Sequence, residues 1–528
     1  MGILGLFLTT LLISQPDSSL TVKIGPDEFW WGCRSNDGYM MPYSGTTETV
    51  IDIYGNNGSN QAQPFLVSSS GRYIWSDEPF RATFHNGEIT IDNAGDDILL
   101  KSGYPSLKDG FLAAAREFFP SDGKIPDEMF FTKPQYNTWI ELIYDQTEDG
   151  IIEYAENILK HGFPPGILMI DDNWQEDYGV WEFSAARFKD PKGMVDRLHK
   201  MGFKVMLWVA PFVSPDCRTY RELRDKGYLI CDKPLGSMKG ISRQASMINW
   251  WNGVSAHLDF SNPGAVNWFH GELKRLQEKY GIDGFKFDGG DSHFFRDGMV
   301  VFEERTPNGH TEDYGKIGLE YPLNEYRASW KLAGKPLVQR LNDKNHSWYD
   351  LKKLIPNSIA QSLLGYAYIC PDMIGGGAYK TFLNPEKIDQ ELIVRSAQTH
   401  ALMPMMQFSV APWRILDEKY QKICKDMADL HTAFGSLFLD LARNASRTGE
   451  PILRPMCWKY PGTEEVTDQF MIGDDLIVAP VVSKGTYKRS VFIPEGRWMS
   501  DTGEKIKGPT TIETEVPIER LPYFTRIK

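Results

Sequence analysis

Between about residue 135 and residue 456, the sequence alternates between strand-like and helix-like runs. The helix-like runs place apolar residues at helical spacing and end on glycine, as in residues 149–162, 191–202 and 263–281. Strand-like runs separate them and cover residues 138–145, 166–172, 204–211, 283–290, 335–341, 365–372, 401–408 and 451–456. Strands that alternate with helices in this number predict a closed (β/α)8 barrel rather than an open sheet.

The segments on either side of this region predict β-structure. Short apolar runs broken by turn residues occur early in the chain, and His85-Asn86-Gly87 is a typical hairpin turn within residues 80–92. Strand-like runs return near the C-terminus, for example at residues 475–482. We therefore expect an α/β protein whose TIM barrel, residues 135–456, is flanked by an N-terminal β-sandwich, residues 20–134, and a C-terminal β-sandwich, residues 457–528.

Composition narrows the classes of function. A chain of 528 residues can hold about three domains. Its net charge of −13 argues against nucleic acid or an anionic membrane as a partner. Aromatic residues reach 13%, with 15 Trp. Aromatic faces pack on sugar rings, but they also fill large cores, so this content is compatible with a sugar-binding protein without requiring one.

The first residues form a possible leader, which we place at residues 1–19. Residues 2–13 are nearly all apolar, and this run is too short to span a bilayer. It resembles the core of a secretion signal, although the basic start and the cleavage site are missing, and a buried first strand is the alternative. We expect a secreted, periplasmic or otherwise extracytoplasmic protein without a membrane span. The six cysteines show no CxxC or zinc spacing and are expected to be free core thiols, with one or two disulfides as the alternative.

Acidic residues follow several of the predicted barrel strands. Asp171 and Asp172 end the second, Asp288 lies in the fourth, and Asp343 and Asp372 follow the fifth and sixth. Any one of them could be a helix cap or turn residue, but the carboxyl ends of barrel strands share one face, where active sites are built. No zinc motif, phosphate loop or serine nucleophile motif is present. Paired carboxylates in an aromatic-rich barrel mouth suit the cleavage of glycosidic bonds.

From about Asp27 to the C-terminus, the chain resembles glycoside hydrolase family 31. The stretch FKFDGGD is similar to the family's nucleophile motif, so the resemblance implies that Asp288 is the nucleophile and that Asp291 holds the motif's last acidic position. The stretch LNDKNHSW is similar to the family's acid/base motif and implies that Asp343 is the general acid/base, with Trp348 behind it. Asn342 replaces a glycine of that motif. DDLIVAPVV resembles the family's C-terminal domain.

Two departures from the family pattern concern the substrate. Lys286 stands where family α-glucosidases often carry Trp, and strand periodicity points it into the same pocket as Asp288. An ion pair made only for charge balance, with Asp171, Asp172 or Asp291, is the alternative role for this lysine. Ser409 lies near the position of a substrate-binding His on a late barrel strand. Together with the stretches FKFDGGD, QRLNDKNHSW and CPDMIGGG, these departures make the chain most similar to the α-galactosidase-like branch of the family.

The resemblance implies a retaining exo-α-glycosidase acting on an α-linked oligosaccharide or glycoconjugate, with α-galactosidase as the first choice. No metal and no cofactor are needed. Besides Asp288 and Asp343, the candidate substrate-binding residues are Asp171, Asp172, Trp208, Trp251, Lys286, Asp291, Arg327, Trp348, Asp372 and Ser409. An α-glucosidase, α-xylosidase or α-N-acetylgalactosaminidase of the same family is the first alternative. A catalytically inactive carbohydrate-binding protein on the same scaffold is the second.

Overall fold

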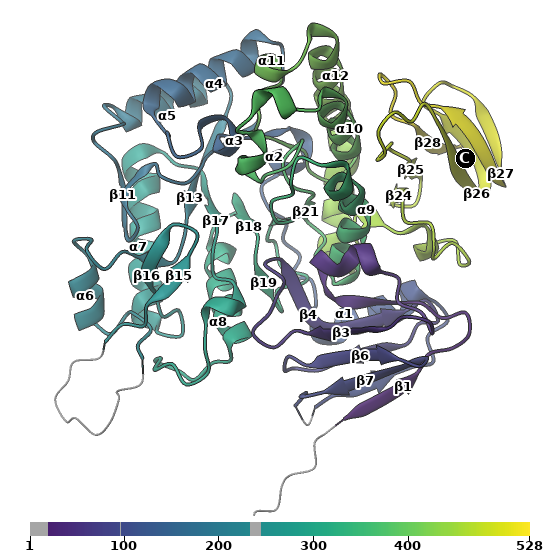
Figure 1. The fold of residues 1–528 in the computed structure, drawn as a ribbon, viewed down its shortest axis with the longest axis horizontal. Coiled ribbons are helices and arrows are strands. Elements are labelled where there is room, and N and C mark those ends of the chain that lie inside the picture. The colour runs from purple at the N-terminus through teal and green to yellow at the C-terminus, as the bar shows by residue number, and fades with distance from the viewer. Residues whose placement is uncertain (1–18, 96, 233–243, 528) are drawn as a thin grey trace, which may run out of the picture.

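The computed structural model describes residues 19–95, 97–232 and 244–527 (Figure 1). Nearly all of the expected leader, residues 1–18, lies outside the described residues. Within the described part of the chain, no helix is both long and apolar enough to cross a membrane. All six cysteines are buried and free, which confirms the expected core thiols.

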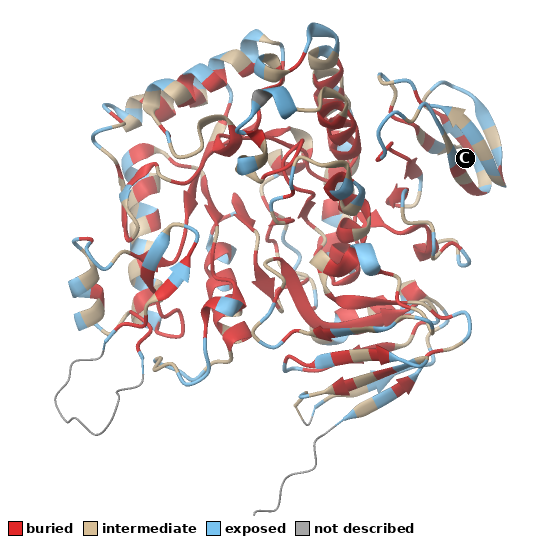
Figure 2. Cartoon of the chain, viewed as in Figure 1, coloured by how far each residue is buried: buried red, intermediate tan, exposed pale blue. Residues whose placement is uncertain are grey.

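Eight parallel strands form the predicted barrel. They lie in the order β21, β20, β18, β17, β13, β10, β9 and β22, and a parallel bridge between Met373 and Gln407 joins the two ends of the sheet. All eight strands are buried along almost their whole length (Figure 2). Their bounds are β9 Gln135–Asn137, β10 Ile167–Ile170, β13 Lys204–Val209, β17 Gly284–Phe287, β18 Asn324–Tyr326, β20 Gln339–Arg340, β21 Ile369–Cys370 and β22 Gln407–Phe408.

Most of the longer helices of the barrel begin at a residue whose side chain caps them. Asn262 caps α7 by accepting a hydrogen bond from the backbone N–H of Gly264, Pro263 follows at the first helical position, and the helix ends at Gly281 with a φ of 81°. Side-chain caps also begin α4, α5, α8, α9 and α10. The bounds are α4 Glu148–Lys160, α5 Pro191–Lys200, α7 Pro263–Tyr280, α8 Pro307–Ile317, α9 Trp348–Leu363, α10 Gln390–Ala401 and α12 Glu418–Thr448.

Two of the predicted barrel strands are wrong and one barrel strand was missed. Residues 138–145 hold the short helix α3, Trp139–Leu142, and the first strand is β9, just before it. The fifth strand, β18, was not predicted, because its three buried residues, Asn-Glu-Tyr, form no apolar run. The strands predicted as fifth, sixth and seventh, at residues 335–341, 365–372 and 401–408, are therefore the sixth, seventh and eighth strands of the barrel. Residues 451–456 contain β23, Leu453–Arg454, which pairs with the C-terminal sheet and not with the barrel.

The N-terminal region contains two sheets, as a sandwich requires, and both are antiparallel except at the edge strand β19 of the second. The first has the order β1, β7, β6, β3, and the hairpin between β6 and β7 turns at Asn86 and Gly87, which both have a positive φ. The second has the order β19, β4, β5, β8, with β2 also paired to β4. The bounds are β1 Leu20–Lys23, β2 Trp30–Arg34, β3 Thr49–Asp52, β4 Gln61–Ser68, β5 Tyr73–Trp75, β6 Arg81–His85, β7 Glu88–Asp92 and β8 Leu99–Lys101.

One strand of the second sheet comes from the barrel region. β19, Ser329–Trp330, lies between barrel strands β18 and β20 in sequence, yet it runs parallel to β4. The N-terminal sheet and the barrel are thus joined by backbone hydrogen bonds as well as by side-chain packing.

The C-terminal strands form one six-stranded antiparallel sheet in the order β23, β24, β25, β28, β26, β27 (yellow in Figure 1). Its buried apolar cluster includes Trp498 and Phe524. The buried Arg395 of α10 attaches the sheet to the barrel, because its guanidinium donates to the carbonyl oxygen of Val516 at 2.8 Å. The remaining bounds are β24 Phe470–Ile472, β25 Leu476–Val478, β26 Lys488–Ser500, β27 Lys505–Glu515 and β28 Tyr523–Ile527.

Candidate active site

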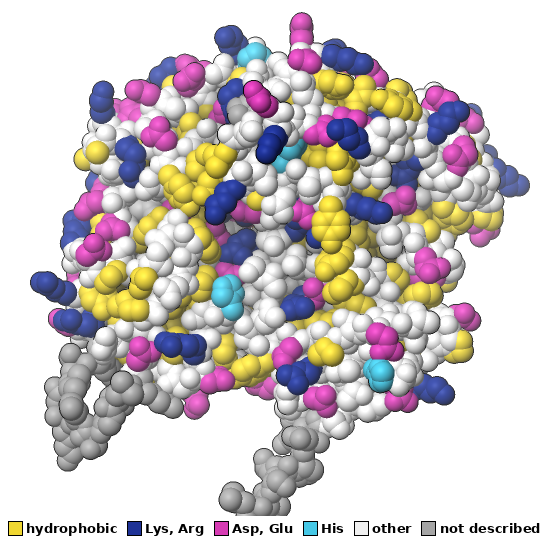
Figure 3. All heavy atoms as spheres, in the orientation of Figure 1, with side chains coloured by type: hydrophobic (Ala, Val, Ile, Leu, Met, Phe, Trp, Pro, Cys, Tyr) yellow, Lys and Arg dark blue, Asp and Glu magenta, His cyan; other side chains and the backbone are white. Residues whose placement is uncertain are grey.

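A cavity of about 600 Å³ opens at the carboxyl ends of the barrel strands. It is visible as a hollow near the centre of the face shown in Figure 3, with acidic and basic side chains at its floor. Nine of the twelve predicted site residues line this cavity: Asp171, Asp172, Trp208, Trp251, Lys286, Asp288, Asp291, Arg327 and Asp343.

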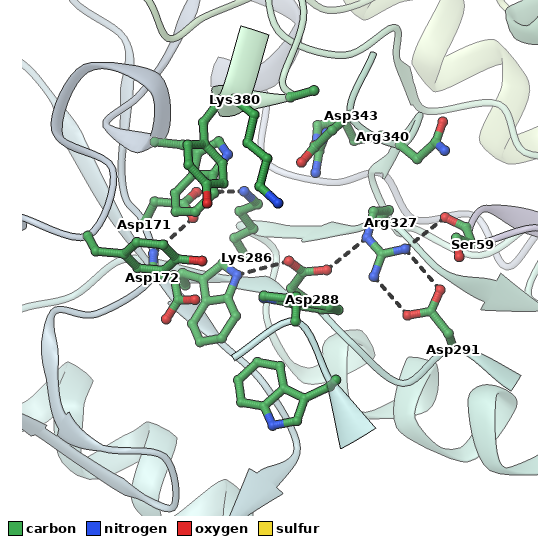
Figure 4. A pocket seen from close by; sticks show the side chains of 18 of the residues that line it. Ser59, Asp171, Asp172, Lys286, Asp288, Asp291, Arg327, Arg340, Asp343 and Lys380 are labelled. Atoms are coloured by element: carbon green, nitrogen blue, oxygen red, sulfur yellow. Dashed lines mark hydrogen bonds and ion pairs between the residues drawn. The ribbon is translucent and has the colours of Figure 1, made fainter. Parts of the chain in front are cut away.

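Asp288 follows β17 and is surrounded by hydrogen-bond donors (Figure 4). The indole N–H of Trp208 donates to its Oδ2 at 3.0 Å, and Arg327 Nε donates to its Oδ1 at 2.9 Å. The backbone N–H of Gly289, whose φ is 72°, donates to the same Oδ1 at 2.8 Å. Trp208 was predicted to bind substrate, and in the structure its indole N–H is hydrogen-bonded to this carboxylate.

The charges around Asp288 keep it ionised. Burial alone would raise the pKa of its carboxyl, but the cations of Arg327, Lys286 and Arg340, together with the Trp208 hydrogen bond, lower that pKa well below its usual range. The nucleophile of a retaining glycosidase must be a carboxylate, so this environment suits Asp288 to that role.

Arg327 is fixed by partners on three sides. Its guanidinium forms a two-pronged ion pair with the buried Asp291, at 2.9 and 2.7 Å, besides its bond to Asp288. It also donates to the carbonyl oxygen of Ser59 in the N-terminal region at 2.9 Å, and it lies 5.6 Å from the ring centroid of Trp251. Both Arg327 and Asp291 were predicted to bind substrate, but the carboxylate of Asp291 is engaged with Arg327.

Asp343 follows β20 on another wall of the cavity. Its side chain is 40% exposed, and its Oδ1 accepts a hydrogen bond from Arg340 Nη1 at 2.8 Å. The backbone N–H of Asn342, just before it, donates to Asn60 Oδ1 at 2.8 Å. An accessible carboxyl opposite a buried carboxylate is the arrangement that acid/base catalysis of glycoside cleavage needs.

Arg340 is a central residue that the sequence did not single out. It is almost fully buried and forms ion pairs with Asp343 at 2.8 Å, Asp372 at 2.8 Å and Glu325 at 3.2 Å. One available signal was its spacing, since it ends a barrel strand three residues before Asp343.

Lys286 and Asp171 form an ion pair within the cavity wall. Their N–O distance is 2.6 Å, and their side chains are only 5% and 3% exposed. Burial lowers the pKa of Lys286, but Asp171 opposes this effect, and the net shift is upward, so the lysine stays charged. The two suggested roles of this lysine therefore coexist: it balances Asp171, and its charge also acts on Asp288.

Asp172 is held by a polar network that the sequence analysis missed. Its Oδ1 accepts from Tyr178 OH at 3.1 Å, and its Oδ2 accepts from Asn252 Nδ2 at 2.6 Å. Asn252 Oδ1 in turn accepts from Tyr144 OH at 2.8 Å. Asn252 lies in the turn between β15, Ile248–Trp250, and β16, Gly253–His257, where Trp251 lines the cavity with 46% of its surface exposed.

Burial and the neighbouring charge of Asp171 raise the pKa of Asp172 to about 7. Between about pH 4 and 7 the folded protein therefore keeps a proton that the unfolded chain has released, so the free energy of unfolding should fall as pH rises through this interval. We expect Asp172→Asn to weaken this pH dependence. The urea midpoint at pH 5 and at pH 8 measures it, and equal pH dependence in the variant and the wild type would contradict the expectation.

Three predicted substrate-binding residues do not line the cavity. Asp372 is fully buried behind Arg340, where it also accepts from the backbone N–H of Lys344. Ser409 is fully buried too, and its Oγ accepts a hydrogen bond from the backbone N–H of Ile140 at 2.7 Å. Trp348 begins α9, and its indole N–H donates to Asp389, the cap of α10, at 3.0 Å. Their roles are structural: they fix Arg340, α3 and α10.

Among the described residues, no group of three or more His, Cys, Asp or Glu side chains is arranged to hold a metal ion. The cavity offers the buried carboxyl groups of Asp171, Asp172 and Asp291, the largely buried carboxylate of Asp288, the accessible carboxyl of Asp343, and a wall of polar and aromatic side chains.

Comparison with known proteins identifies the family. The model of the "Glycosyl hydrolases family 31 TIM-barrel domain" matches residues 133–336, and that of the "Glycosyl hydrolase family 31 C-terminal domain" matches residues 449–527. Mouse myogenesis-regulating glycosidase is 34% identical over 430 residues, which cover 78% of this chain and 58% of that protein. The α-xylosidase XylQ of Lactiplantibacillus pentosus is 24% identical, over 88% of this chain and 63% of its own length.

Solved structures share the fold. A Flavobacterium johnsoniae GH31 dextranase, complexed with glucose, superposes with a TM-score of 0.83 at 21% identity, over 96% of this chain and 66% of that one. The present chain therefore spans somewhat more than half to about two thirds of these proteins. The barrel match contains the FKFDGGD stretch and ends just before the LNDKNHSW stretch, and the C-terminal match contains DDLIVAPVV. The chain belongs to glycoside hydrolase family 31.

Proposed function

We propose that this protein is a retaining exo-α-glycosidase that uses Asp288 and Asp343. The observation that carries the proposal is the environment of Asp288: a buried carboxylate, ionised by Arg327 and Lys286 and bonded to Trp208, at the floor of a sugar-sized cavity. Asp343 lines the same cavity and is accessible from solvent.

The reaction follows from these positions. Asp288 Oδ attacks the anomeric carbon, the bond to the leaving oxygen breaks, and Asp343 gives that oxygen its proton. The resulting β-glycosyl ester on Asp288 is then attacked by water, which transfers its proton back to Asp343. Two displacements restore the α-configuration. Arg327 holds the nucleophile in place during both steps, because Asp291 fixes its guanidinium from the other side.

The sugar we propose is galactose. Asp171 and Asp172 line the cavity and match the family positions close to O4 and O6, where an axial O4 would find a partner. Ser409, in place of the histidine of family α-glucosidases, is turned away from the cavity and bonded to Ile140. The sequence resemblance to the α-galactosidase-like branch supports the same choice, whereas the relatives named above include an α-xylosidase and a dextranase.

A panel of p-nitrophenyl α-glycosides tests both levels of this proposal. A buried polar group left without its partner costs about 1–3 kcal/mol, so a pocket built for an axial O4 should discriminate against glucose. We expect kcat/KM for the α-galactoside to exceed that for the α-glucoside at least about tenfold. Faster cleavage of the glucoside, xyloside or N-acetylgalactosaminide would show that galactose is not the preferred sugar. It would not change the roles proposed for the two aspartates.

A carbohydrate-binding protein without activity is the second candidate from the sequence. The preserved pair of Asp288 and Asp343, with its full set of supporting ion pairs, speaks against it. Release of no nitrophenol from any member of the panel, by a protein that still binds sugar, would favour this candidate.

A further inference from the structure

One lysine of the cavity wall has no carboxylate partner. Lys380 lies in the 3-10 helix η4, Tyr379–Phe382, and Figure 4 shows its side chain extending into the cavity. The other lysine and arginine side chains that line the cavity, Lys286, Arg327 and Arg340, all form ion pairs. Within the part of the chain that the structure describes, neither a hydrogen bond nor an ion pair engages the Lys380 ammonium group.

The loop that carries Lys380 is attached to the loop that carries Asp343. The backbone N–H of Ala378 donates to the carbonyl oxygen of Lys344 at 3.0 Å. The chain also passes directly beside the catalytic carboxyl, because a Cβ added to Gly377 would lie 2.8 Å from Asp343 Oδ1. The loop that carries Lys380 therefore borders the acid/base side of the cavity.

That side is where the leaving group must lie. The acid/base of a glycosidase protonates the glycosidic oxygen, so the wall next to it faces the group that departs rather than the sugar that is attacked. Tyr379, beside Lys380, also lines the cavity, and its ring packs edge-on against Trp139 and Tyr144. A lysine ammonium is a strong donor to carboxylate, sulfate or phosphate oxygens, and this one has no anion of its own.

We propose that Lys380 forms an anion-binding subsite for the leaving group, so that the preferred substrates carry a carboxylate, sulfate or phosphate on the aglycone side of the bond. The proposal rests on the proposed function, because it assigns the acid/base side of the cavity to the leaving group. It adds a preference that neither catalytic aspartate can provide.

A pair of matched substrates tests the subsite. The 3-carboxyphenyl and 3-carbamoylphenyl α-galactosides have nearly the same shape and differ in charge. The measured quantity is kcat/KM for the acid divided by kcat/KM for the amide. In Lys380→Met this ratio should fall about tenfold, the size of one charge-assisted hydrogen bond, whereas Lys380→Arg should keep most of it. Comparing ratios between variants cancels the intrinsic reactivity of the two phenols.

A control variant separates the subsite from general electrostatics. Lys387, seven residues along the chain, is exposed and does not line the cavity, so Lys387→Met should leave the ratio unchanged. An equal fall in both variants would show a long-range effect of net charge and overturn the proposal. An unchanged ratio in Lys380→Met would overturn it as well.

A second substrate pair tests where the anion sits. If Lys380→Met lowers the preference for α-galacturonide over α-galactoside, and not the preference among phenols, the lysine serves the sugar and the proposal is wrong. If galactose is not the preferred sugar, the same phenols are attached to the sugar that the panel selects. If no glycoside is cleaved, the proposed function fails, and the subsite is tested instead by calorimetric binding of the two phenyl glycosides. Loss of the preference for the acid in Lys380→Met would then support the subsite, and an unchanged preference would contradict it.

Discussion

Asp288→Ala should lower the turnover of the best p-nitrophenyl α-glycoside by several orders of magnitude, because the covalent route is lost with its nucleophile. Added azide should restore part of the rate and give the β-glycosyl azide, since a small anion can occupy the space of the missing carboxylate. Nitrophenol release measures the first effect, and proton NMR of the product measures the second. Thermal unfolding checks that the variant is folded.

The matched control for this variant is Asp297→Ala. Asp297 follows Asp288 by nine residues, is exposed, and does not line the cavity, so its loss should leave turnover close to the wild-type value. NMR of the first-formed sugar from the wild type should show the α-anomer. Near-wild-type turnover in Asp288→Ala would falsify the assignment of the nucleophile. A β-anomer as the first product of the wild type would show that the reaction inverts and is not a double displacement.

Arg340→Met should destabilise the fold more than any other single change in the cavity wall. It removes the cation from Glu325 and Asp372, whose side chains are each only 1% exposed. Removing one partner of a buried ion pair typically costs about 3–5 kcal/mol, because the remaining charge is left without compensation. Urea unfolding at neutral pH measures the loss, and the variant should recover part of it at acidic pH, where the two carboxyls can take up protons.

Arg414→Met provides the comparison. Arg414 pairs with Glu141, with side chains 42% and 14% exposed, and an ion pair that is open to solvent typically contributes only about 0–1 kcal/mol. If the two variants lost similar stability, the buried cluster around Arg340 would be no more important than a surface ion pair.

The pattern of the sequence was sufficient to predict the barrel and to locate most of the carboxylates that line its cavity. Residues 166–172, 204–211 and 283–290 contain long apolar strands, and each is a barrel strand in the structure. Asp171, Asp172 and Asp288 could be located because they directly follow such strands. The count of strands failed where strands are short and polar, as in β18, and this failure shifted the number of every later strand by one.

The contacts between side chains could not be predicted from strand ends alone. Ser409 and Asp372 lie next to the ends of barrel strands, yet each is buried because a backbone N–H or Arg340 takes up its polar atoms. Arg340 and Asn252 were missed because little in their local sequence marks them as site residues. Their importance comes from partners that are distant in sequence, Asp372 and Asp172 among them, and only the folded chain brings these together.

The strand β19 has a consequence for anyone who recombines the domains of this protein. It leaves the barrel between β18 and β20 to pair with β4, directly after Arg327, whose guanidinium is bonded to Ser59. Asn60 similarly holds the backbone next to Asp343. A chimaera joined at the boundary between the sandwich and the barrel would exchange the segment whose contacts help to position the two carboxyls that we propose to be catalytic, those of Asp288 and Asp343. The module that can be transplanted is thus the sandwich and barrel together.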